Sequence, residues 1–91
     1  MVFTKRLRER VARGEITCSV RIWHSPRVKV GGDYPMGEGA IHVTSVREIV
    51  LEDITPDLAR ISGFDDVGDL LAVAQHGSGQ NIYLVKFEYR R

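Results

Sequence analysis

Residues 16–23 carry the polar side chains whose types and spacing are best suited to chemistry. They alternate between apolar and polar types, which is typical of a half-buried strand. Because strand side chains alternate between two faces, one face holds Thr17, Ser19, Arg21 and Trp23. A guanidinium offers paired hydrogen bonds to an anion or a base edge, and an indole offers a stacking surface. The strand therefore predicts a base or phosphate site. The alternative is a sheet edge on which Arg21 pairs with an acidic residue and Trp23 packs under a helix.

Two further basic residues, Arg27 and Lys29, follow this strand and share one face of their own. They are expected to extend the positive surface along a single strand of RNA through phosphate contacts. The alternative is that they are ordinary edge-strand charges that discourage aggregation.

A hydroxyl nucleophile, Ser19, needs a base to activate it. His76, in a polar stretch with two glycines, is the first candidate, and Lys86 is the second. A histidine at a helix C-terminus that interacts with the helix dipole is the competing interpretation. Cys18 lies on the apolar face of the strand, where a buried, inert thiol is expected.

No cofactor or metal site is expected. Three aspartates lie close together, but they are better explained as helix N-terminal caps: Asp65, Asp66 and Asp69. The single cysteine excludes an internal disulfide, and no Cys/His spacing fits a structural zinc. No stretch has the length of a membrane span and the N-terminus lacks the apolar core of a secretory signal, so we expect a cytoplasmic protein.

Length and charge place the chain among small globular proteins with an uneven charge distribution. Its 91 residues suffice for one domain, residues 1–91, and a homodimer would enlarge its modest core. Residues 1–31 carry eight Lys/Arg against two Glu, whereas the remaining sixty carry five basic and ten acidic residues. The basic first third can meet phosphate, or it can be a solvated helix face paired with the acidic remainder.

The expected elements follow from periodicity and from cap and turn residues. Helices are predicted over residues 5–13 after a Thr4 cap, over residues 55–63 after Thr55-Pro56-Asp57, and over residues 67–75 before Gly77. Strands are predicted over residues 16–23, 28–30, 40–51 and 81–89, with a turn at residues 31–33.

Several landmarks occur in an order that is similar to the ASCH family, small relatives of the PUA domain. They are Gly14 with the strand to Arg21, Val30-Gly31-Gly32-Asp33-Tyr34, Val43-Thr44-Ser45-Val46, Leu51-Glu52-Asp53-Ile54-Thr55 with Ala59, Gly63 and Phe64, and Tyr83-Leu84-Val85-Lys86-Phe87. The resemblance covers nearly the whole chain. It implies an α+β, PUA-like small mixed β-barrel of five to six strands, two or three short helices, and a cleft beside the strand of residues 16–23.

The resemblance also implies RNA binding, and some small family members hydrolyse N4-acetylcytidine. Their strand resembles G-x-K-x-x-T-x-R, whose glycine, threonine and arginine fall on Gly14, Ser19 and Arg21. The lysine position is Ile16, and the position of the catalytic glutamate falls near Ser62. The chain therefore keeps a hydroxyl and an arginine but lacks the family's base.

Three functions remain open. The first is binding of RNA or a modified nucleoside by Thr17, Ser19, Arg21, Trp23, Arg27 and Lys29. The second is a nucleoside-directed hydrolase, acting as an N4-acylcytidine amidohydrolase or a ribonuclease, with Ser19 and His76 as catalytic residues. The third is a protein-interaction domain that uses the barrel without RNA.

Overall fold

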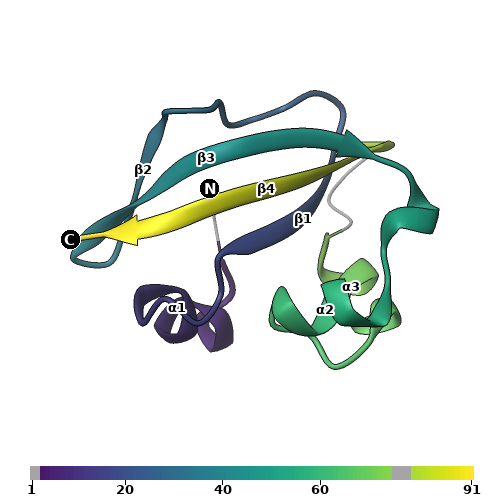
Figure 1. Cartoon of the computed structure of the whole chain (residues 1–91), viewed down its shortest axis with the longest axis horizontal. Helices are drawn as coiled ribbons and strands as arrows, with labels where there is room; N and C mark the ends of the chain where they lie inside the picture. The colour runs from purple at the N-terminus through teal and green to yellow at the C-terminus, as the bar shows by residue number, and fades with distance from the viewer. Residues whose placement is uncertain (1–2, 75–78) are drawn as a thin grey trace.

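The computed structural model describes residues 3–74 and 79–91, which form a mixed α+β fold (Figure 1). Its elements in chain order are α1 (Lys5–Ala12), β1 (Cys18–Trp23), β2 (Asp33–Met36), β3 (Gly39–Ile49), the 3-10 helix η1 (Leu51–Asp53), α2 (Pro56–Ile61), α3 (Val67–Ala74) and β4 (Asn81–Arg90). None of the helices in these ranges is long and apolar enough to cross a bilayer.

The strands form one curled antiparallel sheet in the order β1-β4-β3-β2. The register between β3 and β4 shifts between Val43 and Ser45, where an extra residue makes a β-bulge. A bulge bends its strand and increases the local twist, which helps the sheet to curl. A barrel of five to six strands was expected; over the described residues the sheet has four strands and is a half-barrel.

The segment after β1 differs most from the sequence-based expectation. Residues 28–30 form no strand: Val28 is buried, whereas Val30 is exposed. Gly31 has φ +83 and donates its backbone N–H to the carbonyl of Val43 at 2.8 Å, so the chain turns here onto β3. The strand β2 follows directly, and its Pro35 is tolerated because β2 is the edge of the sheet.

The three α-helices lie on one side of the curled sheet (Figure 1). Thr55 caps α2 as predicted, because its hydroxyl oxygen accepts from the N–H of Leu58 at 3.1 Å. Thr4 occupies the N-cap position of α1 without a side-chain hydrogen bond, and its carbonyl accepts from the N–H of Leu7 and Arg8. The predicted extension of the last helix to Gln75 and Gly77 lies outside the described residues.

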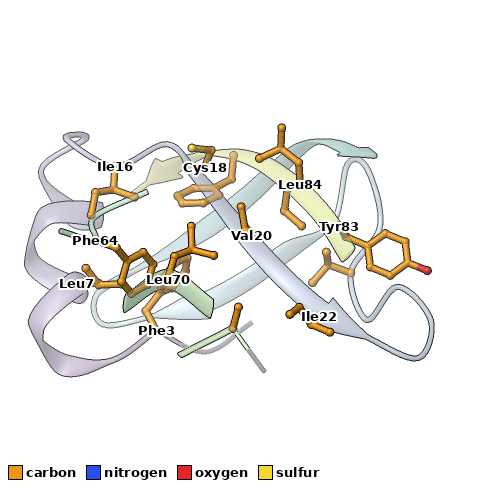
Figure 2. Packing of buried hydrophobic residues seen from close by; sticks show 14 of the residues in the cluster. Phe3, Leu7, Ile16, Cys18, Val20, Ile22, Phe64, Leu70, Tyr83 and Leu84 are labelled. Atoms are coloured by element: carbon orange, nitrogen blue, oxygen red, sulfur yellow. The ribbon is translucent and has the colours of Figure 1, made fainter. Parts of the chain in front are cut away.

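The buried side chains make one core cluster between the sheet and the helices (Figure 2). Its largest fully buried apolar side chains are Val11, Ile16, Ile41, Val43, Leu70 and Val85. The strand β1 is buried on both faces, since Ser19 and Trp23 are buried just as Cys18 and Val20 are. The expectation of a half-buried strand is therefore wrong, and the reason is that β1 lies against α3 as well as in the sheet.

Gly63, which follows α2, allows the backbone to pass close to Leu7 of α1 and to Ile16. Gly63 has φ +97, a conformation that side chains of L-residues rarely adopt. A Cβ placed there would lie 2.6 Å from Ile16 Cδ1 and 2.6 Å from Leu7 Cδ2. The backbone after α2 can approach the core only because this residue has no side chain.

Candidate functional site

A pocket of about 490 Å³ is lined by residues of the N-terminal segment with α1, of the strand β1 and the segment after it, and of the helix α3. Its lining residues are Phe3, Thr4, Leu7, Ser19, Val20, Arg21, Trp23, Arg27, Val28, Phe64, Val73 and Ala74. The size is in the range of small-molecule sites, which are mostly apolar with a few polar groups that orient the ligand. Four of the six residues predicted to bind a ligand line this pocket: Ser19, Arg21, Trp23 and Arg27.

The guanidinium of Arg21 is held by two neighbours. Its Nε donates a hydrogen bond to Ser19 Oγ at 2.8 Å, as expected for residues two apart on one strand face. Its Cζ lies 4.8 Å from the centroid of the Phe3 ring, a cation–π contact. Phe3 in turn packs against Phe87 with ring centroids 5.4 Å apart. The arginine is thus positioned by its own strand, by the residue before the α1 N-cap and, through that residue, by β4.

Arg21 has no ion pair with any carboxylate in the described part of the chain. Burial lowers the pKa of its guanidinium from the ordinary arginine value to about 10. Arg6 provides a contrast at the same end of the fold: it also lies over a phenylalanine, Phe64, but its Nη2 pairs with Asp69 at 3.0 Å. The alternative in which Arg21 pairs with an acidic residue is therefore not the arrangement observed.

Ser19 is buried and faces the arginine rather than a base. Its Oγ accepts from Arg21 Nε, and no general base contacts it among residues 3–74 and 79–91. Val85 lies opposite Ser19 in the register, so the exposed Lys86 next to it points to the other face of the sheet. His76, the other candidate base, lies outside the described residues.

Trp23 was predicted to offer a stacking surface, but little of its side chain is accessible. It is 5% exposed, and its ring lies 6.0 Å from that of Tyr83 at an interplanar angle of 35°. Most of the indole is therefore part of the core, and only its remaining surface lines the pocket. Phe3 and Phe64 supply further aromatic lining, although neither was predicted to contact a ligand. Both are isolated aromatics beside helix ends, and no periodicity connects them to β1.

The other predicted binding residues, Thr17 and Lys29, do not line the pocket. Thr17 is exposed and precedes β1, where its carbonyl accepts from the N–H of Phe87 at 3.0 Å. Lys29 is exposed, and its backbone N–H donates to the hydroxyl of Tyr34 at 2.9 Å. Of the strand face predicted to contact a ligand, only Ser19, Arg21 and Trp23 therefore line the pocket.

The remaining candidates have structural roles. Cys18 Sγ lies 3.5 Å from Ser62 Oγ, and both side chains are buried. Asp66 Oδ1 accepts from the N–H of Asp69 at 2.7 Å, and Asp69 Oδ2 accepts from the N–H of Asp65 at 3.1 Å, which are bonds of the helix-capping type. The hydrogen bond from the Asp65 N–H, followed by the pairing with Arg6, lowers the pKa of the Asp69 carboxyl.

A second cavity of about 750 Å³ lies between α1, the β2–β3 turn and the end of β4. Its lining mixes Arg8 and Arg91 with Glu9 and Glu38. The pocket at β1 differs in that its described lining holds two arginines and no carboxylate. Of these two cavities, the pocket at β1 therefore fits better the positive, partly aromatic character that the sequence predicts for a base or phosphate site.

Comparisons of this chain with protein-family models, with curated proteins and with solved structures gave no match.

Proposed function

We propose that the protein is a binding domain of the ASCH type, with a PUA-like fold, whose pocket beside β1 holds RNA or a modified nucleoside. The observation that carries the proposal is Arg21, a partly buried guanidinium without a carboxylate partner in the described residues. Removing a cation from water is costly unless it is paired. A ligand that offers acceptors to this guanidinium offsets the cost, so the site is adapted to an anion or a polar base edge.

The surroundings of Arg21 favour a nucleic-acid component over a plain anion. Phe3, Phe64 and the accessible part of Trp23 supply aromatic surface for a base, while Arg27 adds a second cation. The N-terminal third of the chain, which forms two walls of the pocket, carries eight Lys/Arg against two Glu. This charge attracts a polyanion before any specific contact forms.

Binding is favoured over catalysis because the described residues supply no base to Ser19. The hydroxyl oxygen accepts from the Arg21 Nε, and Lys86 lies on the opposite face of β4. An unassisted hydroxyl is a weak nucleophile. The pocket instead presents the serine as the group that orients Arg21.

The proposal is tested by titrating fluorescein-labelled single-stranded RNA into the protein at about 50 mM and about 200 mM salt. We expect binding that weakens with salt and falls at least about tenfold in Arg21→Ala, since charge-assisted hydrogen bonds contribute this much. Arg60→Ala is the matched control, because Arg60 pairs with Asp57 on α2 and does not line the pocket. No binding of RNA or nucleosides at low salt, or equal loss in both variants, contradicts the proposal and favours a protein-interaction domain.

A further inference from the structure

We infer that the ligand of this pocket carries a terminal phosphate monoester, bound by the Nη1 and Nη2 groups of Arg21. The inference rests on the proposed function and narrows it: the favoured ligands are a nucleotide or the phosphorylated end of an RNA, rather than a nucleoside or an internal stretch of the chain.

The first step concerns which donors of Arg21 are still available. A guanidinium has five N–H donors, one on Nε and two on each Nη. The Nε donor is used by Ser19 Oγ at 2.8 Å, and one face of the group lies against the Phe3 ring. No other side-chain hydrogen bond of this guanidinium occurs within residues 3–74 and 79–91. The pair of Nη groups therefore remains for an external acceptor.

The second step concerns the shape of that acceptor. Two parallel Nη–H groups match two oxygens of one phosphate or carboxylate, which is the bidentate geometry that arginine favours. The Ser19 bond and the Phe3 ring restrain the guanidinium, so little side-chain freedom is lost when the oxyanion binds. A neutral base edge could accept from the same two Nη groups, but hydrogen bonds to uncharged acceptors are weaker than those to an oxyanion.

The third step concerns charge. Two arginines and no acidic residue contribute to the described lining, so the site favours an anion of more than one charge. An internal phosphodiester carries one negative charge, whereas a terminal phosphate monoester carries between about one and a half and two at neutral pH. The terminal group therefore matches the pair Arg21 and Arg27 better than an internal phosphate does.

The fourth step concerns the rest of the ligand. Much of the remaining lining of the pocket is apolar and includes Leu7, Val28, Phe64, Val73 and Ala74. These apolar side chains offer no hydrogen bond to free phosphate, but they can cover the flat face of a base. A phosphate joined to a base through one sugar provides a group for the arginines and a flat apolar face for the rest of this lining.

The only tryptophan of the chain, Trp23, lines the pocket, so its fluorescence reports binding without a label. The probes are a short single-stranded RNA with a 5′-phosphate, with a 3′-phosphate or with neither, a nucleoside, its 5′-monophosphate, and inorganic phosphate. We expect the phosphorylated ends and the monophosphate to bind at least about tenfold more tightly than the unphosphorylated RNA or the nucleoside, because a charge-assisted pair is gained. The two RNA ends distinguish which terminal phosphate is preferred.

The wild-type protein alone decides the inference, and the variants locate the phosphate. Arg21→Lys keeps the charge but not the fork, so it is expected to lose most of the preference for phosphorylated probes, whereas Arg60→Ala keeps it. Lowering the pH below about 6 protonates the phosphate monoester and should weaken only the phosphorylated probes. Equal affinity for RNA with and without a terminal phosphate overturns this inference and leaves RNA binding intact. Absence of binding by every probe overturns the proposed function as well.

Discussion

The Nε of Arg21 donates to the Oγ of Ser19 at 2.8 Å, between residues two apart on one face of β1. This bond turns a hydroxyl that the sequence marks as a nucleophile into the group that orients a cation. Because the Nε donor is used by this bond, the Nη groups are the donors that remain available for a ligand. The pocket is therefore organised around the arginine rather than around the serine.

Removing the Ser19 hydroxyl should weaken both ligand binding and the fold. In Ser19→Ala the Nε donor loses its acceptor, so we expect the affinity for phosphorylated RNA to fall several-fold and the free energy of unfolding to fall by about 1 kcal/mol. Fluorescence titration and urea denaturation measure the two effects. Ser62→Ala is the control, since Ser62 is also buried but lies outside the pocket. A Ser19→Ala protein that binds as tightly as the wild type would contradict the orienting role.

Removing the Arg21 charge should stabilise the fold at neutral pH. Burial holds the pKa of this guanidinium at about 10 in the folded chain, well below its ordinary value, so folding disfavours its charged form. The pKa difference corresponds to about 3 kcal/mol. We expect the free energy of unfolding of Arg21→Met to exceed that of the wild type by about 1–2 kcal/mol at neutral pH. The gain is smaller than the full amount of about 3 kcal/mol because the contacts with Ser19 and Phe3 are lost at the same time.

The pH dependence of that difference follows from the same pKa values. Above about pH 10, and up to the ordinary pKa of arginine, the unfolded chain holds more protons at this residue than the folded chain, so the contribution of Arg21 to stability rises with pH. The advantage of Arg21→Met over the wild type is fully present below about pH 9 and should shrink as the pH rises through about 10. Urea denaturation of both proteins across this range measures it. A stability difference between Arg21→Met and the wild type that grows with pH would contradict the lowered pKa of Arg21.

A side chain at residue 63 should be costly. In Gly63→Ala, the φ of +97 is strained and the new Cβ would lie 2.6 Å from both Leu7 and Ile16. We expect a loss of about 2–4 kcal/mol from backbone strain and overpacking together. Gly68→Ala in α3 is the matched control: the nearest atom to its Cβ is Asp66 Oδ1 at 3.4 Å, and alanine favours a helix. Thermal denaturation that finds the two variants equally stable would refute the close approach.

The two threonines at helix starts should differ in importance. Thr55→Ala removes the hydrogen bond to the N–H of Leu58, for which we expect a loss of about 1 kcal/mol. Thr4→Ala should cost less, because Thr4 makes no side-chain capping bond. Chemical denaturation of both variants tests the pair, and a larger loss for Thr4→Ala would reverse the assignment.

The long strands and the helix starts were predictable because each is a local pattern. Alternation located the segments that become β1, β3 and β4, and the Thr55-Pro56-Asp57 signal located α2. The strand β2 was missed because it is short, contains Pro35 and lies at an edge, so its residues alternate only between exposed and half-buried positions. The curl into a four-stranded half-barrel depends on the shift between Val43 and Ser45, and apolar spacing alone does not specify a bulge.

The sequence by itself determined which side chains share a face, because the two-residue period of a strand places Ser19 and Arg21 side by side regardless of the rest of the fold. Only the tertiary structure decided what surrounds them. Phe3 comes from the other end of the α1 segment, Phe64 follows α2, and both reach the pocket by packing rather than by periodicity. Packing also buried the second face of β1 and left Arg21 without a carboxylate among the described residues. Burial and pairing depend on contacts between distant segments, and those contacts are the basis of the proposed anion site.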